Sequence, residues 1–203
     1  RLYLHNSIAD QFLDKMLLQA QNIKLGDPLE DATQMGPLAT YAQIEHVERQ
    51  VEMAKVEGGN ILTGGDRDNT PDIGWYYPPT IVECPRQNLT IVGTELFGPV
   101  LSVLRFDEED EVLQMANDSQ YGLAAGVFTH DGARALRMTK ALRAGIVWVN
   151  TYRVVSPIAE FGGFKDSGYG RESGMQAIYD YTRPKTAWLN ISNAPLGNPF
   201  VMR

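Results

Sequence analysis

The sequence predicts an α/β protein with a twisted, mostly parallel sheet, helices on both faces and a separate C-terminal strand. Two observations carry this prediction. Beyond residue 95, strand-like apolar stretches alternate with helix-like amphipathic ones, at residues 100–106, 108–118, 124–129, 133–142 and 146–149. That order describes two consecutive βαβ units, whose helical crossovers imply parallel strands. The chain has 203 residues, 43% of them hydrophobic, so it can bury one sizeable core.

The chain opens with a predicted strand and helix. Residues 1–5 alternate as a strand does, and Ser7 is expected to cap a helix over residues 8–21. The apolar face of that helix is expected to hold Ile8, Phe12, Met16 and Leu17.

A second helix is predicted after the turn-rich residues 25–40, with Thr40 as its N-cap and an end at Gly58-Gly59. Its apolar stripe consists of Ile44, Val47, Val51 and Ala54. A short strand follows at residues 61–63. Residues 75–84 are expected to be extended, because Pro78 and Pro79 exclude a helix.

The remaining segments have weaker patterns. Acidic residues 107–111 fall at a predicted helix start, where negative charge is favourable against the helix dipole, so we interpret them as structural. Residues 151–171 are glycine-rich and irregular, and a short helix is expected near residues 174–181. A last strand is predicted at residues 185–189, followed by a tail from residue 193 that needs a partner surface to be ordered.

Composition excludes several classes of function. A formal net charge of −7 and a pI near 5.0 provide no basic stripe for nucleic acid or for an anionic membrane surface. No apolar stretch approaches the roughly 20 residues of a membrane span. Cys84 is the one cysteine, and the three histidines lack metal-ligand spacing. These features predict a cytoplasmic protein without a structural metal, and the first residue, Arg1, suggests that the chain begins inside a longer one.

Three possible sites are weak on sequence grounds. Residues 162–172 are glycine-rich, but they lack the third glycine and the preceding strand of a dinucleotide-binding fingerprint. Ser167 has no Gly-x-Ser-x-Gly surroundings and no assignable histidine base, which argues against a hydrolase. Cys84 ends a strand before a proline, without the cationic neighbour that activates a thiol, and is expected to be inert.

Glu95 and Phe97 are stronger candidates. They stand just before the Gly98-Pro99 turn, and in an extended segment residues two apart point to the same side. A carboxylate accepts hydrogen bonds from a vicinal diol and a ring supplies an apolar wall, which together suit a ribose carrying a flat base. The alternative is a turn with a solvated Glu95 and a core Phe97.

Four segments together resemble the aldehyde dehydrogenase superfamily, over residues 1–189. They are residues 95–100 (Glu-Leu-Phe-Gly-Pro-Val), 121–126 (Tyr-Gly-Leu-Ala-Ala-Gly), 145–150 (Gly-Ile-Val-Trp-Val-Asn) and 161–172 (Phe-Gly-Gly-Phe-Lys-Asp-Ser-Gly-Tyr-Gly-Arg-Glu). The resemblance is to the C-terminal, catalytic-domain portion of these enzymes. It implies a catalytic domain over residues 1–184 and an oligomerisation strand and tail over residues 185–203.

The resemblance also implies a chemistry. Glu95 and Phe97 match the positions that bind the nicotinamide ribose and contact the nicotinamide ring of NAD or NADP, a cofactor held mainly by an N-terminal Rossmann-like domain that this chain lacks. Phe161 matches an aromatic residue of the aldehyde tunnel. Glu160 replaces the usual proline before it, which together with Arg153 leaves the substrate preference open.

In the family a cysteine thiolate attacks the aldehyde, hydride passes to NAD(P), and a glutamate activates the water that hydrolyses the thioester. The resemblance places all of these groups upstream of Arg1, so no catalytic residue is expected here and the chain alone should be inactive. Residues 185–189 resemble the strand that pairs subunits in homodimers and tetramers. A non-catalytic assembly module is the alternative.

Overall fold

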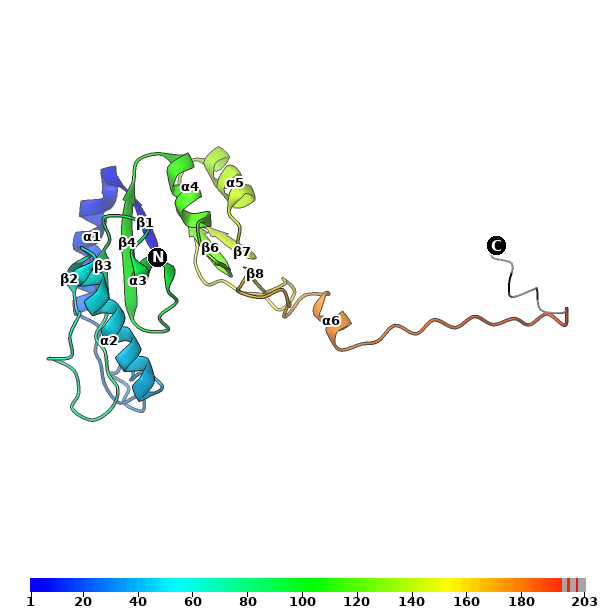
Figure 1. The fold of residues 1–203 in the computed structure, drawn as a ribbon, viewed down its shortest axis with the longest axis horizontal. Coiled ribbons are helices and arrows are strands. Elements are labelled where there is room, and N and C mark those ends of the chain that lie inside the picture. Colours follow the sequence, from blue (N-terminus) through cyan, green and yellow to red (C-terminus); the bar gives the residue numbers. More distant parts are fainter. Residues whose placement is uncertain (195–196, 198–199, 201–203) are drawn as a thin grey trace.

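A four-stranded sheet organises the first half of the chain in this computed structural model, which describes residues 1–194, 197 and 200 (Figure 1). The strand order is β1–β4–β3–β2, where the strands are β1 (Leu2–His5), β2 (Asn60–Thr63), β3 (Thr80–Glu83) and β4 (Val100–Phe106). β4 is parallel to both β1 and β3, and only the edge strand β2 is antiparallel. The predicted mostly parallel sheet is therefore confirmed.

Helices cover both faces of this sheet, because successive strand residues point to opposite sides. Ile81 and Val103 pack with Ala9 and Leu13 of α1 (Asn6–Gln21). Their neighbours Val82 and Leu104 lie on the other face, in the cluster that contains the apolar stripe of α2 (Tyr41–Val56). The main core is thus two layers, one on each side of β3 and β4.

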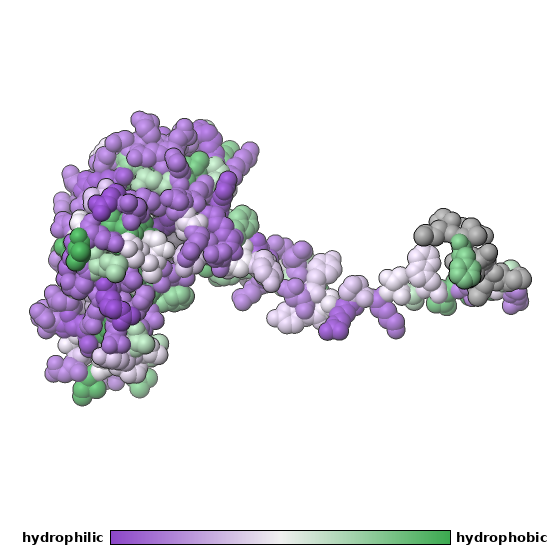
Figure 2. Space-filling model, in the orientation of Figure 1, coloured by the Kyte–Doolittle hydropathy of each residue, from purple (hydrophilic) through white to green (hydrophobic). Residues whose placement is uncertain are grey.

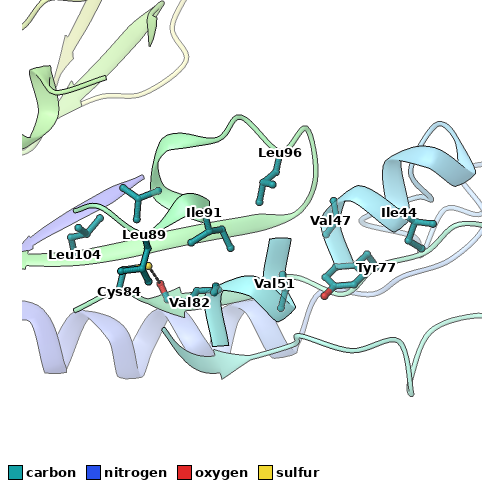
Figure 3. Packing of buried hydrophobic residues seen from close by; sticks show 12 residues of the cluster. Ile44, Val47, Val51, Tyr77, Val82, Cys84, Leu89, Ile91, Leu96 and Leu104 are labelled. Atoms are coloured by element: carbon teal, nitrogen blue, oxygen red, sulfur yellow. Dashed lines mark hydrogen bonds between the residues drawn. The ribbon is translucent and has the colours of Figure 1, made fainter. Parts of the chain in front are cut away.

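α2 forms as predicted. Its N-cap is Thr40, whose hydroxyl oxygen accepts a hydrogen bond from the Gln43 amide at 3.2 Å, and the helix ends at Val56 before Gly58. Figure 3 shows three of its side chains in the core cluster with Val82 and Leu104 of the sheet. The buried residues of α2 are Ile44, Val47, Val51 and Ala54.

α1 differs from the prediction in its cap and its buried face. The His5 ring accepts a hydrogen bond from the Ser7 amide at 3.1 Å, so His5 and not Ser7 is the N-cap. Ala9 and Leu13 are buried, whereas the predicted core residues Ile8 and Phe12 are 52% and 42% exposed. Met16 and Leu17, the other two residues predicted for that face, are partly buried and do pack against this cluster.

The second half contains one of the two predicted βαβ units. β6 (Ala124–Val127) and β7 (Ile146–Val149) are parallel and are joined through α5 (Gly132–Ala141). β4 and β6 belong to different sheets, so the other predicted unit does not close as a ladder. After α4 (Glu109–Asn117) the chain first forms β5 (Tyr121–Gly122), which pairs antiparallel with β8 (Phe164–Lys165).

The acidic run at the start of α4 is structural, as expected. Glu109, Asp110 and Glu111 occupy the first helical turn. The Glu109 carboxylate accepts hydrogen bonds from Arg134 at 3.0 Å and Arg137 at 2.8 Å, which joins α4 to α5. The bonds from Arg137, followed by those from Arg134, lower the pKa of Glu109 to about 2.

The C-terminal segment leaves the body of the molecule after the short helix α6 (Ala177–Asp180), as Figures 1 and 2 show. Residues 185–189 pair with no strand of the described chain, and Trp188 is 94% exposed. The strand predicted at these residues is therefore not formed in the described chain. Part of the predicted tail, residues 195–196, 198–199 and 201–203, lies outside the described residues. In the described part, every helix is too short or too polar to span a membrane.

Candidate functional site

The loop between α3 (Thr90–Gly93) and β4 carries the two cofactor candidates. Glu95 and Phe97 are exposed on either side of Leu96, which is buried in the core cluster beside α2 (Figure 3). Phe97 is 77% exposed, so the alternative of a core phenylalanine is wrong. The Glu95 carboxylate has no hydrogen bond or ion pair to any described residue and remains available as an acceptor.

Phe97 is not extended, contrary to the reasoning from alternation. Its φ of 50° lies in the left-handed region, which costs a non-glycine residue about 1 kcal/mol or more. Neighbouring contacts hold it there. The side-chain amide of Gln43 donates to the Phe97 carbonyl at 3.0 Å, and Thr80 donates to the Pro99 carbonyl at 2.8 Å. The loop is therefore fixed to both α2 and the sheet.

A pocket of about 490 Å³ opens beside the Phe97 ring. Its other walls come from residues 35–38, Tyr77 and the Gly98-Pro99 turn, and they are mostly apolar. An open apolar wall with a ring and a nearby unpaired carboxylate can hold a flat base attached to a diol. Residues 35–38 and Gln43 were not found by sequence reasoning, because nothing in their local pattern links them to a loop more than fifty positions away.

Phe161 lines a second pocket, of about 410 Å³, with the glycine-rich loop. Its backbone exchanges two hydrogen bonds with Glu172, at 2.8 and 2.7 Å, which close the loop into a hairpin. The Arg171 guanidinium donates to the carbonyls of Gly163 and Gly170, both at 2.9 Å. Carbonyls converge on a cation here, so this loop is not a cradle of amides for phosphate.

Ser167 also has a structural role. Its hydroxyl oxygen accepts a hydrogen bond from the Gly122 amide at 3.0 Å, which ties the glycine-rich loop to β5. This contact agrees with the sequence argument against a serine nucleophile.

Gly145 packs backbone against backbone on Gly162, which is part of the lining of the second pocket. A Cβ atom on Gly145 would lie 1.8 Å from the Gly162 carbonyl oxygen, and one on Gly162 would lie 2.3 Å from the Gly170 carbonyl oxygen. Side chains are excluded at both positions. Two motifs that are separate in the sequence are therefore one packed unit.

Arg153 lies in the exposed loop after β7 and lines neither pocket. Its φ of 59° is left-handed, and its guanidinium has no partner among the described residues. The Trp148 indole donates to the Val154 carbonyl at 2.8 Å and anchors the loop behind it. The structure thus places Phe97 and Phe161 at different pockets, Glu95 exposed two residues before Phe97 but outside the lining of its pocket, and Arg153 in open solvent.

Cys84 is buried, with 4% of its surface exposed, and its sulfur lies 3.7 Å from the Val82 carbonyl oxygen (Figure 3). Burial raises the pKa of the thiol to about 11. A thiol that stays protonated at neutral pH is a poor nucleophile, which is in keeping with the sequence argument against Cys84 as a nucleophile. No three acidic, histidine or cysteine side chains in the described chain are placed to hold a metal ion.

Comparison with known proteins gives one consistent result. The family model described as Aldehyde dehydrogenase family matches residues 1–187. A (Z)-2-((N-methylformamido)methylene)-5-hydroxybutyrolactone dehydrogenase from Acinetobacter baylyi is 48% identical over all of this chain and 41% of its own length. A betaine aldehyde dehydrogenase from Brucella anthropi is 40% identical over 94% of this chain and 40% of its own length.

Solved structures agree. The NAD+ complex of an aldehyde dehydrogenase from Bacillus cereus superposes with a TM-score of 0.89 at 40% identity, covering 94% of this chain and 38% of that one. The chain therefore spans about two fifths of the length of the relatives that it matches.

Proposed function

Because this chain belongs to the aldehyde dehydrogenase family, we propose that it forms the catalytic-domain portion of an NAD(P)-dependent enzyme that oxidises an aldehyde to a carboxylic acid. Relatives named as dehydrogenases, and the NAD+ complex of the Bacillus cereus protein, support a nicotinamide cofactor. The names of the relatives cover a hydroxybutyrolactone and betaine aldehyde, so the proposed substrate is stated as a class, an aldehyde.

The loop of Glu95 and Phe97 would close over the nicotinamide end of that cofactor. The observation that carries this proposal is an unpaired carboxylate and an exposed ring on either side of one buried leucine, beside an apolar pocket. Glu95 would accept hydrogen bonds from the ribose hydroxyls, and Phe97 would pack on the nicotinamide ring. The bound cofactor supplies the hydride acceptor, and the loop supplies its orientation.

Phe161 and Arg153 would contact the aldehyde substrate. Phe161 already lines a pocket, and the exposed Arg153 belongs to a loop rich in exposed apolar side chains, including Val154 and Ile158. Such a mixture suits a substrate with an apolar body, and the aromatic residue would form one wall of its channel.

The isolated chain would not catalyse this reaction. The oxidation needs a cysteine thiolate, and Cys84, the one cysteine in the sequence, is buried and protonated at neutral pH. The nucleophile, general base and oxyanion donor would come from the rest of the enzyme, as would most of the cofactor site.

Glu95→Gln in the full-length enzyme tests the cofactor role. The substitution keeps the shape of the side chain but replaces a charged acceptor oxygen with a donor, and loss of one such interaction costs about 1.5 to 3 kcal/mol, roughly ten- to a hundredfold. We expect kcat to fall and the KM for cofactor to rise, with little change in the KM for aldehyde or in Tm.

Steady-state kinetics with cofactor varied, beside a thermal melt, is the measurement. Glu30→Gln is the matched control, because Glu30 is also an exposed glutamate with no side-chain hydrogen bond and lies outside the loop. If both variants show the same cofactor kinetics, Glu95 is a solvated turn residue and does not bind cofactor.

An assembly module without activity is the second candidate, and the exposed arm at residues 185–189 favours it, since Trp188 is 94% exposed. Mixing this chain with its upstream partner segment separates the two functions. If the chain is part of an enzyme, the reconstituted complex oxidises an aldehyde. If it is an assembly module, a complex of larger mass forms but no aldehyde is oxidised.

A further inference from the structure

We propose that Gln43, on α2, is a positioning residue that sets the backbone of the Phe97 loop for cofactor binding. The inference rests on the proposed function of that loop and adds a residue that neither the sequence patterns nor the family resemblance assigned. It concerns a residue that acts through Phe97 and is distinct from the groups proposed to touch cofactor.

The side-chain amide of Gln43 serves two carbonyls at once. Its nitrogen donates to the carbonyl of Leu96 and, at 3.0 Å, to the carbonyl of Phe97. A primary amide has two N–H groups, so both are used within the protein. Gln43 itself is held in place, because its backbone amide donates to the Thr40 hydroxyl at the N-cap of α2.

Those two carbonyls belong to the strained part of the loop. Phe97 has a φ of 50°, a conformation that persists in a non-glycine residue only when surrounding contacts enforce it. The side chains of Leu96 and Phe97 are apolar and cannot donate to these carbonyls. The hydrogen bonds described at both carbonyls come from the Gln43 amide. Without it the loop can relax toward an extended backbone, and the Phe97 ring then moves away from the pocket wall.

α2 holds this segment at its other end as well, which provides a control. The carboxylate of Glu57, just beyond the C-terminal end of α2, accepts from the amide of Thr90 at 2.7 Å and from its hydroxyl at 2.6 Å. Thr90 begins α3, several residues before the loop. Breaking the Glu57 contact should loosen the attachment of α3 while leaving Phe97 in place.

Kinetics of Gln43→Met and Gln43→Glu in the full-length enzyme test the proposal. Methionine keeps the length of the side chain and removes both donors, whereas glutamate places a charged oxygen against two carbonyl oxygens. We expect Gln43→Met to raise the KM for cofactor and lower kcat, about tenfold in kcat/KM, and Gln43→Glu to have a larger effect. The KM for aldehyde should change by less than about twofold, an asymmetry that a general loss of stability would not produce.

Hydrogen exchange provides a readout that is independent of cofactor. In Gln43→Met, the amides of residues 95–98 and 100 should exchange faster, and in Glu57→Gln the faster exchange should centre on residues 89–93 with cofactor kinetics unchanged. Gln43→Asn, which is one methylene shorter, replaces Gln43→Met if the latter does not fold.

Phe97→Leu separates the two possible failures. If Phe97→Leu weakens cofactor kinetics and Gln43→Met does not, the positioning role is wrong while the cofactor site stands. If neither variant changes cofactor kinetics, the loop is not a cofactor site and both proposals fall. Unchanged exchange at residues 95–98 and 100 in Gln43→Met would overturn the positioning role by itself.

Discussion

At the scale of single residues, burial decides what Cys84 can do. The thiol lies between the sheet and the α2 layer, and its pKa is raised from the ordinary 9.0 to about 11 because the charged thiolate would be desolvated. The folded chain therefore holds the Cys84 thiol proton more tightly than the unfolded chain does. The resulting contribution to the stability of the folded state is fully present below pH 9 and is lost as the pH rises from 9 toward 11.

We expect two results from the isolated chain. At pH 8 a thiol reagent should label Cys84 about a hundredfold more slowly in the folded chain than in urea, from the thiolate fraction alone. No aldehyde oxidation should be seen with NAD or NADP. Turnover above a protein-free control that disappears in Cys84→Ala would make Cys84 a nucleophile and contradict both expectations.

At the scale of elements, one carboxylate supplies the ion pairs between α4 and α5, beside the apolar contact of Val112 with Met138. Glu109 binds Arg134 and Arg137, and its pKa is lowered from the ordinary 4.5 to about 2. A lowered carboxylate pKa stabilises the folded state above pH 4.5, and this stabilisation disappears as the pH falls from 4.5 to about 2.

Glu109→Gln should therefore lower Tm at pH 7, and the difference from the unmodified chain should shrink as the pH falls from 4.5 to about 2. Thermal melts across this range are the measurement. Glu108→Gln is the control, because Glu108 precedes α4, makes no side-chain cap hydrogen bond and forms no ion pair in the described chain. Equal losses of Tm in the two variants would mean that the ion pairs do not join the helices.

The elements also show which parts of the fold were accessible from sequence. α2 was predicted with its cap and its buried stripe because it has a single apolar row and an unambiguous Thr40. In α1 the buried face is set by packing against the sheet, a tertiary feature that the apolar pattern does not show. Between β4 and β6 the chain forms β5, which pairs with β8, and these two-residue strands are too short to leave a periodic pattern.

The candidate site follows the same division. The residue types at Glu95 and Phe97 indicated a binding loop, since a carboxylate and an aromatic ring beside a turn are local features. The left-handed backbone of Phe97 and its link to Gln43 were not accessible, because they join positions 53 and 54 residues apart. Local chemistry was predicted, and the contacts that orient it required the fold.

At the scale of the whole molecule, the arm beyond α6 should cause self-association. Residues 185–189 carry unpaired backbone groups and the exposed Trp188, and pairing with a second subunit would satisfy both. The chain should therefore form dimers or larger assemblies at tens of micromolar. Deleting residues 185–203 should reduce the oligomer size or the solubility.

Light scattering of the 203-residue chain and of the deletion variant measures this directly. Trp188→Ser is a milder variant that keeps the arm and removes most of its exposed apolar surface. A monomeric unmodified chain at these concentrations would show that the arm does not join subunits.

The contact between Gly145 and Gly162 has a consequence for how substrate preference could change. A side chain at position 145 would displace the Gly162 carbonyl, and with it the hairpin that carries Phe161, although position 145 is not part of the lining of the Phe161 pocket. The shape of the Phe161 pocket therefore depends on a position outside its lining. On the proposed function, a change at position 145 is a route to an altered substrate preference in which Phe161 itself is kept.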